Sequence, residues 1–475
     1  MMFAYSEHAV KEQPHGNRGN HRLDCGDDRA RPQTGSFARP RERFRVVTAT
    51  PTQGAAGGSL DRPPFEGGRP GGGRQLRTFD SFSDREFRWF YLALLGQMAA
   101  MNMQMLARGY LAFDLTGSFA ALGVVSLGSA APMLILSVFG GVLADRAPKK
   151  LVLQAGQLAN AVTAVIVGFL LLFDLLQFAH LLVAGIAHGI ALALMMPSRQ
   201  AILPEVVGMD RLMNAVSLSA AASNLMRLAA PALGGFMIAF IGAEWVYFLM
   251  AALYGFAVVT LGQVRLQHEP AARPRRTSGY ADLVEGVRYV IAERTLGLLL
   301  LAGMVGALLA LPYQIMLPGF VRDVLGGGPI ELGLLIAVSA VGSLAGSLVL
   351  ASLPARRRGL LLLLSSLFVG VALIGFASTR LIWLSGFFML FVGIGSAGRQ
   401  ALGNVLLQHY SLDEYRGRVM SLYMTEFGIM SFGAVLFGLF AEQVGGQWAF
   451  GTVSAVLVVL TLAMIAFLPR LRRLD

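Results

Sequence analysis

Long apolar runs begin near residue 89 and continue almost to the end of the chain. Each run holds about 20 residues, which is the length that an α-helix needs to cross roughly 30 Å of hydrocarbon. The core of a water-soluble protein does not require so many runs of this length. The pattern predicts twelve transmembrane helices, at about 89–113, 118–143, 151–173, 178–197, 212–240, 244–263, 295–319, 330–353, 359–377, 381–402, 418–440 and 446–469.

Residues 1–88 lack this pattern and instead contain 15 Lys/Arg and 11 Asp/Glu. Such a segment cannot bury enough apolar surface to offset its ordering entropy, so we expect a disordered cytoplasmic tail. It has no apolar stretch followed by a small-residue cleavage site, which argues against a secretory signal peptide. A start codon assigned too far upstream would also produce such a tail. His8, His15, His21 and Cys25 do not follow a zinc-ligand spacing, so no metal site is predicted.

Composition agrees with a membrane protein, because 55% of the residues are hydrophobic and only 14% are charged, against about 25% charged in soluble domains. The net charge of +11 is compatible with nucleic-acid binding, but basic residues placed between apolar runs are typical of cytoplasmic loops. The Arg/Gly-rich stretch 69–77 is therefore interpreted as a solvated linker, and no nucleic-acid partner is expected. The chain contains no P-loop, metal cluster or nucleophile motif, so we expect neither an enzyme nor a cofactor.

The distribution of Lys and Arg predicts the orientation of the chain. With the N-terminus inside, 20 of them, Arg199 and Arg399 among them, are assigned to the predicted cytoplasmic loops and C-terminus, and two to the predicted outer loops. Two more lie inside spans and 15 in the tail, which completes the 39 in the chain. The 20-to-2 bias predicts that both termini are cytoplasmic. The multi-pass chain is expected in the plasma or inner membrane, with the lipid bilayer as its partner, and to function as a monomer.

The twelve spans divide into two halves of six, at 89–264 and 295–475, joined by a cytoplasmic linker at 265–294. Tyr280–Arg294 in this linker is predicted to form an amphipathic helix on the membrane surface. Three short motifs recur in the same order in both halves, which indicates a duplicated six-helix unit; one pair is Arg199-Gln-Ala and Arg399-Gln-Ala. Duplicated helical bundles around a midplane site are typical of secondary transporters.

Two loop motifs resemble a known family. The segment Gly141-Val-Leu-Ala-Asp145-Arg146-Ala-Pro-Lys149-Lys150 is similar to the loop signature of the major facilitator superfamily, with Pro148 at a position where glycine is common. Met196-Pro-Ser-Arg199-Gln-Ala and Arg416-Gly-Arg418-Val-Met look like the branch that contains enterobactin exporters and drug-efflux proteins. The resemblance covers residues 78–470. It implies an all-α fold of twelve transmembrane helices in two six-helix halves.

The resemblance also implies a cytoplasmic gate formed by Gly141, Asp145, Arg146, Lys149 and Lys150. In that family the acidic residue approaches the start of span eleven, here near Gly417-Arg418, where a helix N-terminus favours a carboxylate. The basic residues of the motif also fit a pure topology signal. A second element, Ala230-Pro-Ala-Leu-Gly234-Gly235, is similar to the antiporter element G-P-x-x-G-G and therefore favours export.

Charged residues inside the spans are candidates for the substrate cavity and for proton coupling, because a charge near the bilayer centre costs at least about 2.5–3.5 kcal/mol. Glu426 lies deep in span eleven and Arg227 near the middle of span five. Arg108 either lines the cavity or reaches the outer surface, and Asp114 is expected at the outer mouth. Glu426 is a candidate to carry the coupling proton. The alternatives are a permanent pair with Arg227 and a simple attraction for cationic substrates.

Three functions fit these features. The first is a proton-driven secondary exporter of small amphiphilic molecules, drug-like or siderophore-like, that works by alternating access. The second is an importer with the same fold, and the third is a membrane sensor or scaffold without turnover. The midplane carboxylate and the antiporter-like element favour the first.

Overall fold

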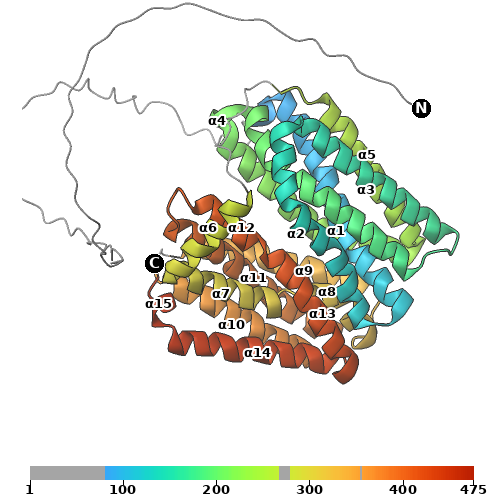
Figure 1. Cartoon of the computed structure of the whole chain (residues 1–475). Coiled ribbons are helices and arrows are strands. Elements are labelled where there is room, and N and C mark those ends of the chain that lie inside the picture. The colour runs from blue at the N-terminus through green and yellow to red at the C-terminus, as the bar shows by residue number, and fades with distance from the viewer. Residues whose placement is uncertain (1–80, 267–278, 354–355, 475) are drawn as a thin grey trace, which may run out of the picture. The chain divides into compact units, whose positions relative to one another are not determined.

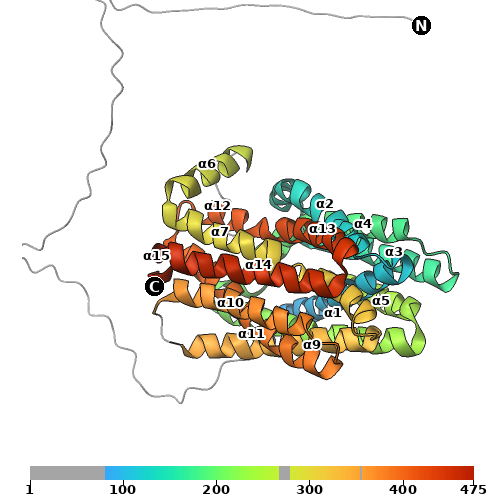
Figure 2. The same cartoon turned by 90° about the horizontal axis from the view of Figure 1, so that it is seen from below.

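The computed structural model describes residues 81–266, 279–353 and 356–474, with the side chains of 137–146 and 279–283 excepted. Every regular element in these ranges is a helix, as Figures 1 and 2 show. The helices are α1 (Arg85–Thr116), α2 (Phe119–Arg146), α3 (Lys149–Leu172), α4 (Phe178–Ile241), α5 (Ala243–Gln263), α6 (Gly279–Ala292), α7 (Arg294–Leu309), α8 (Tyr313–Asp323), α9 (Pro329–Ser352), α10 (Arg358–Ala377), α11 (Ile382–Tyr410), α12 (Arg416–Met424), α13 (Glu426–Val444), α14 (Gly446–Phe467) and α15 (Pro469–Arg472).

The helices form two groups that follow the order of the chain. Helices α1 to α5 pack on one another and make the N-terminal half, blue to green in Figure 1. Helices α6 to α15 make the C-terminal half, yellow to red. The all-α architecture predicted from the apolar runs is confirmed by this arrangement.

Ten stretches of the described helices are long and apolar enough to cross a membrane, by length and composition. One of them, α4, has 64 residues and bends at Gly208, where φ is 71°. At 1.5 Å per residue it is far longer than one crossing, and it contains the predicted fourth and fifth spans. Helix α1 has 32 residues and is the predicted first span, although it is less apolar than the others. Counting α4 twice and adding α1 gives the twelve predicted spans.

Local chemistry determines where α1 begins and ends. The Asp84 side chain accepts a hydrogen bond from the backbone N–H of Glu86 at 2.9 Å, as expected of an N-cap residue. Gly117 ends the helix in the left-handed conformation, with φ at 62°, and its N–H bonds to the Phe113 carbonyl. The turn after Gly117 leads directly into α2.

Two of the predicted spans are broken. Span seven divides into α7 and α8 around Pro312, which cannot donate a backbone hydrogen bond. Span eleven divides into α12 and α13 at Thr425, whose hydroxyl bonds to the Leu422 carbonyl at 2.6 Å. Interrupted helices at membrane depth are tolerated where protein or a water-filled cavity surrounds them.

We call the side of the bundle with Arg85, Lys149, Gly208, Arg358 and Tyr410 the termini side. The opposite side, with Gly117, Phe173, Gly242, Ser378 and Gly445, is called the far side. This assignment follows from the helix ends and does not depend on a membrane.

The two halves touch through α2 with α13 and through α4 with α9. Small residues allow this approach. A methyl group added at Gly438 would lie 2.5 Å from the Phe119 carbonyl oxygen, and one at Gly333 would lie 2.6 Å from that of Pro231. Gly235, in the same antiporter-like element as Pro231, has no room for a side chain beside Pro329. Glycines at such crossings permit close packing of membrane helices. The halves are therefore tightly joined towards the far side.

The predicted amphipathic helix of the linker corresponds to α6. Val290 on its apolar face is buried, whereas Val287 and Ile291 are exposed. Helix α6 packs on α12, where Gly286 lies against Arg418 and Glu285 pairs with the Arg418 guanidinium at 3.1 Å.

Candidate functional site

Glu426 lies inside the C-terminal half, in the first turn of α13 directly after the break at Thr425. Only 8% of its surface is exposed. Its Oε1 atom is buried and has no hydrogen-bond partner among the described residues. A carboxylate in these surroundings is costly unless it is paired, protonated or reached by water. Glu426 is thus a buried acidic group whose charge its surroundings must compensate.

The cation that faces Glu426 is Arg399 of α11. Its Nη1 atom lies 3.8 Å from Oε2 of Glu426, and the arginine is 5% exposed. The alternative that Glu426 pairs with Arg227 is therefore wrong. Arg399 was also counted among the cytoplasmic loop cations, and this too is wrong, because α11 continues as a helix to Tyr410. Arg199 was misplaced in the same way and lies within α4.

Two glycines of α7 make room for the ion pair. A methyl group at Gly303 would collide with Oε1 of Glu426, and one at Gly306 would lie 3.0 Å from Nη1 of Arg399. A cavity of about 10 Å³ adjoins the pair, which is about the space that one water molecule needs. Tyr423 of α12 lines the same cavity and is buried. The arrangement can hold a charged pair and a proton donor or acceptor in a confined space.

The other charged candidates lie elsewhere. Arg227, on the second leg of α4, is exposed and within electrostatic range of Tyr313 on α8 of the other half. Arg108 lies within the N-terminal half, where its Nη1 donates to Ser129 Oγ at 2.7 Å and its charge acts on Tyr247 and Tyr254. The structure does not bring Arg108 or Arg227 to Glu426.

Asp114 lies on the far side, where it forms an exposed ion pair with Arg322 of α8 at 3.8 Å. A stronger contact lies beside it. Glu442, near the end of α13, accepts hydrogen bonds from Ser118 Oγ at 2.7 Å and from the Ala120 N–H at 3.1 Å. It therefore caps the N-terminus of α2 from the opposite half, a position that favours a negative charge. Both contacts hold the halves together at the far side.

The gate motif is described only in part. Gly141, Asp145 and Arg146 lie at the end of α2, but their side chains are outside the described residues, so the predicted contact of Asp145 with Gly417-Arg418 is not tested. Lys149 forms an ion pair with Glu205 of α4. Lys150 donates to the carbonyls of Gly262 and Val264, at 2.6 and 2.8 Å, where α5 ends and a cation is favourable.

The Lys149–Glu205 pair leads to a stability prediction. Glu205 is buried, so Lys149→Met removes a cation from beside a buried carboxylate and should lower the free energy of unfolding by up to about 3 kcal/mol. Thermal unfolding of the purified protein in detergent measures this. The double variant Lys149→Met/Glu205→Leu should recover most of the loss, because an apolar pair needs no charge compensation. A double variant as unstable as Lys149→Met alone would contradict the assignment.

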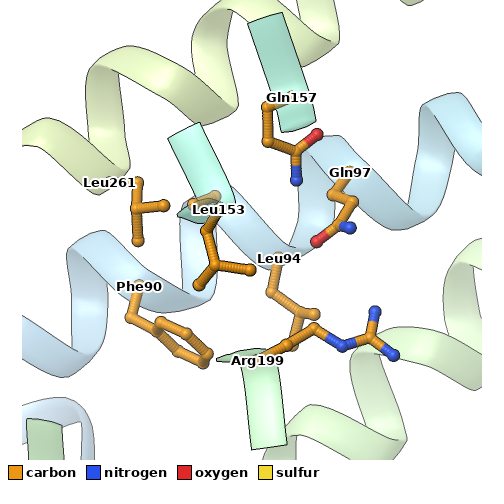
Figure 3. A pocket seen from close by; sticks show the side chains of 8 residues that line it. Phe90, Leu94, Gln97, Leu153, Gln157, Arg199 and Leu261 are labelled. Carbon is orange, nitrogen blue, oxygen red and sulfur yellow. The ribbon is translucent and has the colours of Figure 1, made fainter. Parts of the chain in front are cut away.

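Arg199 occupies the position in the N-terminal half that Arg399 occupies in the C-terminal half, according to the repeated Arg-Gln-Ala motif. Figure 3 shows its guanidinium beside a small cavity that Gln97 and Gln157 also line. No carboxylate lines this cavity. The residue that aligns with Glu426 in the repeat is Ser219, at the offset of 207 that relates Arg211 to Arg418. The two halves share the arginine, but of the two cavities beside these arginines only the one in the C-terminal half is lined by a carboxylate.

Several buried polar residues form bonds between helices of the N-terminal half. His188 of α4 is hydrogen-bonded to Asn160 of α3 at 3.0 Å. Gln104 of α1 accepts a hydrogen bond from the Tyr254 hydroxyl of α5 at 3.1 Å. Each satisfies a polar group that would otherwise be costly in the bundle. These contacts give His188 and Gln104 a structural role between helices.

The sequence interpretation missed Arg399, Tyr423, Gly303 and Gly306 as neighbours of Glu426. One signal for Arg399 was available, since the Arg-Gln-Ala repeat occurs within a stretch that stays compatible with a helix on both sides. The glycines of α7 carried no signal, because glycine is common throughout the spans.

Comparison with known proteins agrees with this architecture. Residues 77–475 match the family described as transmembrane secretion effectors. The enterobactin exporter EntS of Salmonella typhi is 28% identical over 80% of this chain and 90% of its own length. The multidrug efflux pump Tap of Mycolicibacterium fortuitum is 25% identical over 81% of this chain and 95% of its own. The staphyloferrin A transporter of Staphylococcus aureus is 24% identical, over 72% and 86% of the two chains.

Solved structures agree at the level of the fold. The nucleoside transporter NupG superposes with a TM-score of 0.66 at 12% identity, over 80% of this chain and 99% of its own. A peptide transporter of the POT family gives 0.65 at 15% identity, over 82% and 95% of the two chains. These proteins are transporters and not enzymes. The chain belongs to the transmembrane secretion effector family, and with it to the major facilitator superfamily, and it is similar to efflux and siderophore-export proteins of that superfamily.

Proposed function

We propose that this protein is a proton-coupled exporter of small amphiphilic molecules that works by alternating access in the plasma or inner membrane. The observation that carries the proposal is the buried Glu426, held beside Arg399 at the break between α12 and α13. A group with these surroundings can exchange a proton when the conformation changes. The related efflux and siderophore-export proteins support the direction of transport.

The contacts between the halves support the alternating-access part of the proposal. They join α2 to α13 and α4 to α9 towards the far side, with Glu442 capping α2. With both termini in the cytoplasm, as the positive charges favour, the far side is extracellular. The structure then corresponds to a state closed to the outside, in which a proton on Glu426 can be released to the cytoplasm. A secondary exporter needs this step before it binds its next substrate.

The proposal is tested in inverted membrane vesicles that contain the full chain. An acidic lumen should drive accumulation of at least one probe among ethidium, a radiolabelled macrolide and a catechol siderophore. Collapse of the pH gradient should abolish this accumulation, whereas collapse of the membrane potential alone should leave most of it. Vesicles without the protein are the control.

The alternatives give different results. Uptake into right-side-out vesicles, driven by an inward proton gradient, would instead identify an importer. Absence of movement for all three probes, together with no change in the resistance of a drug-sensitive host, would favour a sensor or scaffold. Accumulation that persists without a pH gradient would contradict proton coupling and leave the exporter assignment intact.

A further inference from the structure

Glu426 and Arg399 lie on helices that pack against different halves of the protein. Helix α11, which carries Arg399, packs on α9 and α10 within the C-terminal half. Helix α13, which carries Glu426, packs extensively on α2 of the N-terminal half. Ser126 of α2 and Ser431 of α13 are joined by a hydrogen bond of 2.9 Å. A movement of one half against the other therefore acts on the helix of the carboxylate more directly than on that of the guanidinium.

The pair has a contact that such a movement can change. The Nη1–Oε2 distance of 3.8 Å is within ion-pair range but too long for a hydrogen bond. Oε1 of Glu426 has no hydrogen-bond partner among the described residues and faces the space that Gly303 leaves open. The carboxylate is thus held by charge attraction and not by a fixed set of hydrogen bonds. Its stability as an anion depends on the separation from Arg399.

Few other groups compete for this role. The titratable or charged groups that face Glu426 are Arg399 of α11 and Tyr423 of α12. The described parts of α2 and α14 and the facing part of α7 contain no titratable residue. Helix α8 also packs on α13, and it carries Tyr313, Arg322 and Asp323. Of these, Tyr313 is directed to Ser339 and Arg322 to Asp114.

We infer that Arg399 is the positioning residue that controls proton release from Glu426. When the guanidinium lies close, as here, it stabilises the carboxylate and the proton leaves. When α2 separates from α13 in the alternate state, α13 loses this packing and shifts relative to α11. The carboxylate then loses its cation and takes up a proton, because burial favours the neutral form. Arginine suits this role since it stays charged at any physiological pH. The inference rests on the proposed function, but it can be measured without transport.

The test is an infrared titration of the full chain in membranes. The band of the protonated carboxyl group is followed against pH, and the spectrum of Glu426→Gln is subtracted to isolate Glu426. In Arg399→Gln the pH of half-protonation should rise by about one to three units, because a cation within about 4–6 Å favours the charged form by that amount. Arg399→Lys keeps a charge and should restore most of the wild-type value.

Arg199→Gln is the matched control, since Arg199 holds the equivalent position but has no carboxylate in its cavity. It should leave the Glu426 midpoint unchanged. Gly306→Ala places a methyl group 3.0 Å from the guanidinium, keeps both charges, and should raise the midpoint by a smaller amount. Gly306→Ala decides the matter if Arg399→Gln does not fold. An unchanged midpoint in Arg399→Gln, or in Gly306→Ala where the first variant does not fold, would overturn the inference, and so would an equal shift in Arg199→Gln.

The two proposals can fail separately. If the pH of half-protonation of Glu426 depends on Arg399 but transport does not depend on the pH gradient, the proposed coupling is refuted and the inference stands. If the pH gradient drives transport but substitution of Arg399 does not change the Glu426 midpoint, the inference is refuted and the proposed coupling stands.

Discussion

Glu426→Gln should abolish accumulation driven by a pH gradient in inverted vesicles, while exchange of labelled for unlabelled substrate continues. Glutamine has nearly the same shape as glutamate, but its side chain cannot be reversibly protonated and deprotonated at physiological pH. Movement of the halves does not itself require the charge, so exchange survives. The loss of driven accumulation should be at least tenfold, down to the level seen without a gradient; a tenfold change corresponds to about 1.4 kcal/mol of coupling free energy.

The same substitution at the other end of α13 provides a matched control. Glu442→Gln keeps a side-chain oxygen that can accept the hydrogen bonds from Ser118 and Ala120. It should therefore retain gradient-driven accumulation. Glu426→Asp keeps the carboxylate and should show partial activity. If Glu426→Gln accumulates substrate as the wild type does, Glu426 has only a structural role.

A disulfide between residues 126 and 431 should stop transport completely. The hydroxyl oxygens of Ser126 and Ser431 lie 2.9 Å apart on α2 and α13, in opposite halves. Sulfur atoms at these positions are within reach of bond formation after a small adjustment of the side chains. The bond would fix the far-side contact between the halves, so the alternate state could not form. The Ser126→Cys/Ser431→Cys variant should be made in a Cys25→Ser background, because Cys25 is the only native cysteine.

Reduction is the internal control for the cross-link. Transport of the oxidised double variant should be near zero and should return after treatment with a membrane-permeant reductant. The single variants should transport under both conditions. Full activity of a quantitatively cross-linked protein would mean that α2 and α13 stay together throughout the cycle, which contradicts the proposed motion.

The apolar pattern predicted the fold well, because the length and composition of a membrane span are properties of a local segment. It divided α4 correctly into two crossings, although only Gly208 separates them. It could not show that spans seven and eleven are interrupted. Proline in a membrane helix is compatible with both a continuous and a broken helix, and Thr425 gives no signal by its residue type.

The sequence predicted how deep Glu426 lies within its span, but not which neighbouring residue its side chain faces. Counting residues from Arg418 places Glu426 well inside its span, and the side chain is indeed buried. The alternative of a pair with Arg227 is wrong, because depth along a helix does not determine which neighbour a side chain faces. Arg399 lies near the end of the predicted tenth span, 381–402, but was assigned to the cytoplasmic loops because basic residues at a span end usually mark the cytoplasmic side. Only the packing of α11 against α7 and α12 shows that this charge lies inside.

The single residue between the two crossings of α4 has a mechanical consequence. A backbone with φ of 71° and ψ of 171° at Gly208 suits glycine, and helix continues on both sides of it. A long loop would let one crossing tilt without moving the other, whereas a single glycine between two helical segments allows little independent movement. The second crossing lies against α9 of the opposite half at Pro231 and Gly235, and the first lies against α2 and α3 at Gly189 and Met195. We therefore expect a tilt of the second crossing, caused by a movement of α9, to be passed on through Gly208 to the first crossing, which carries Arg199.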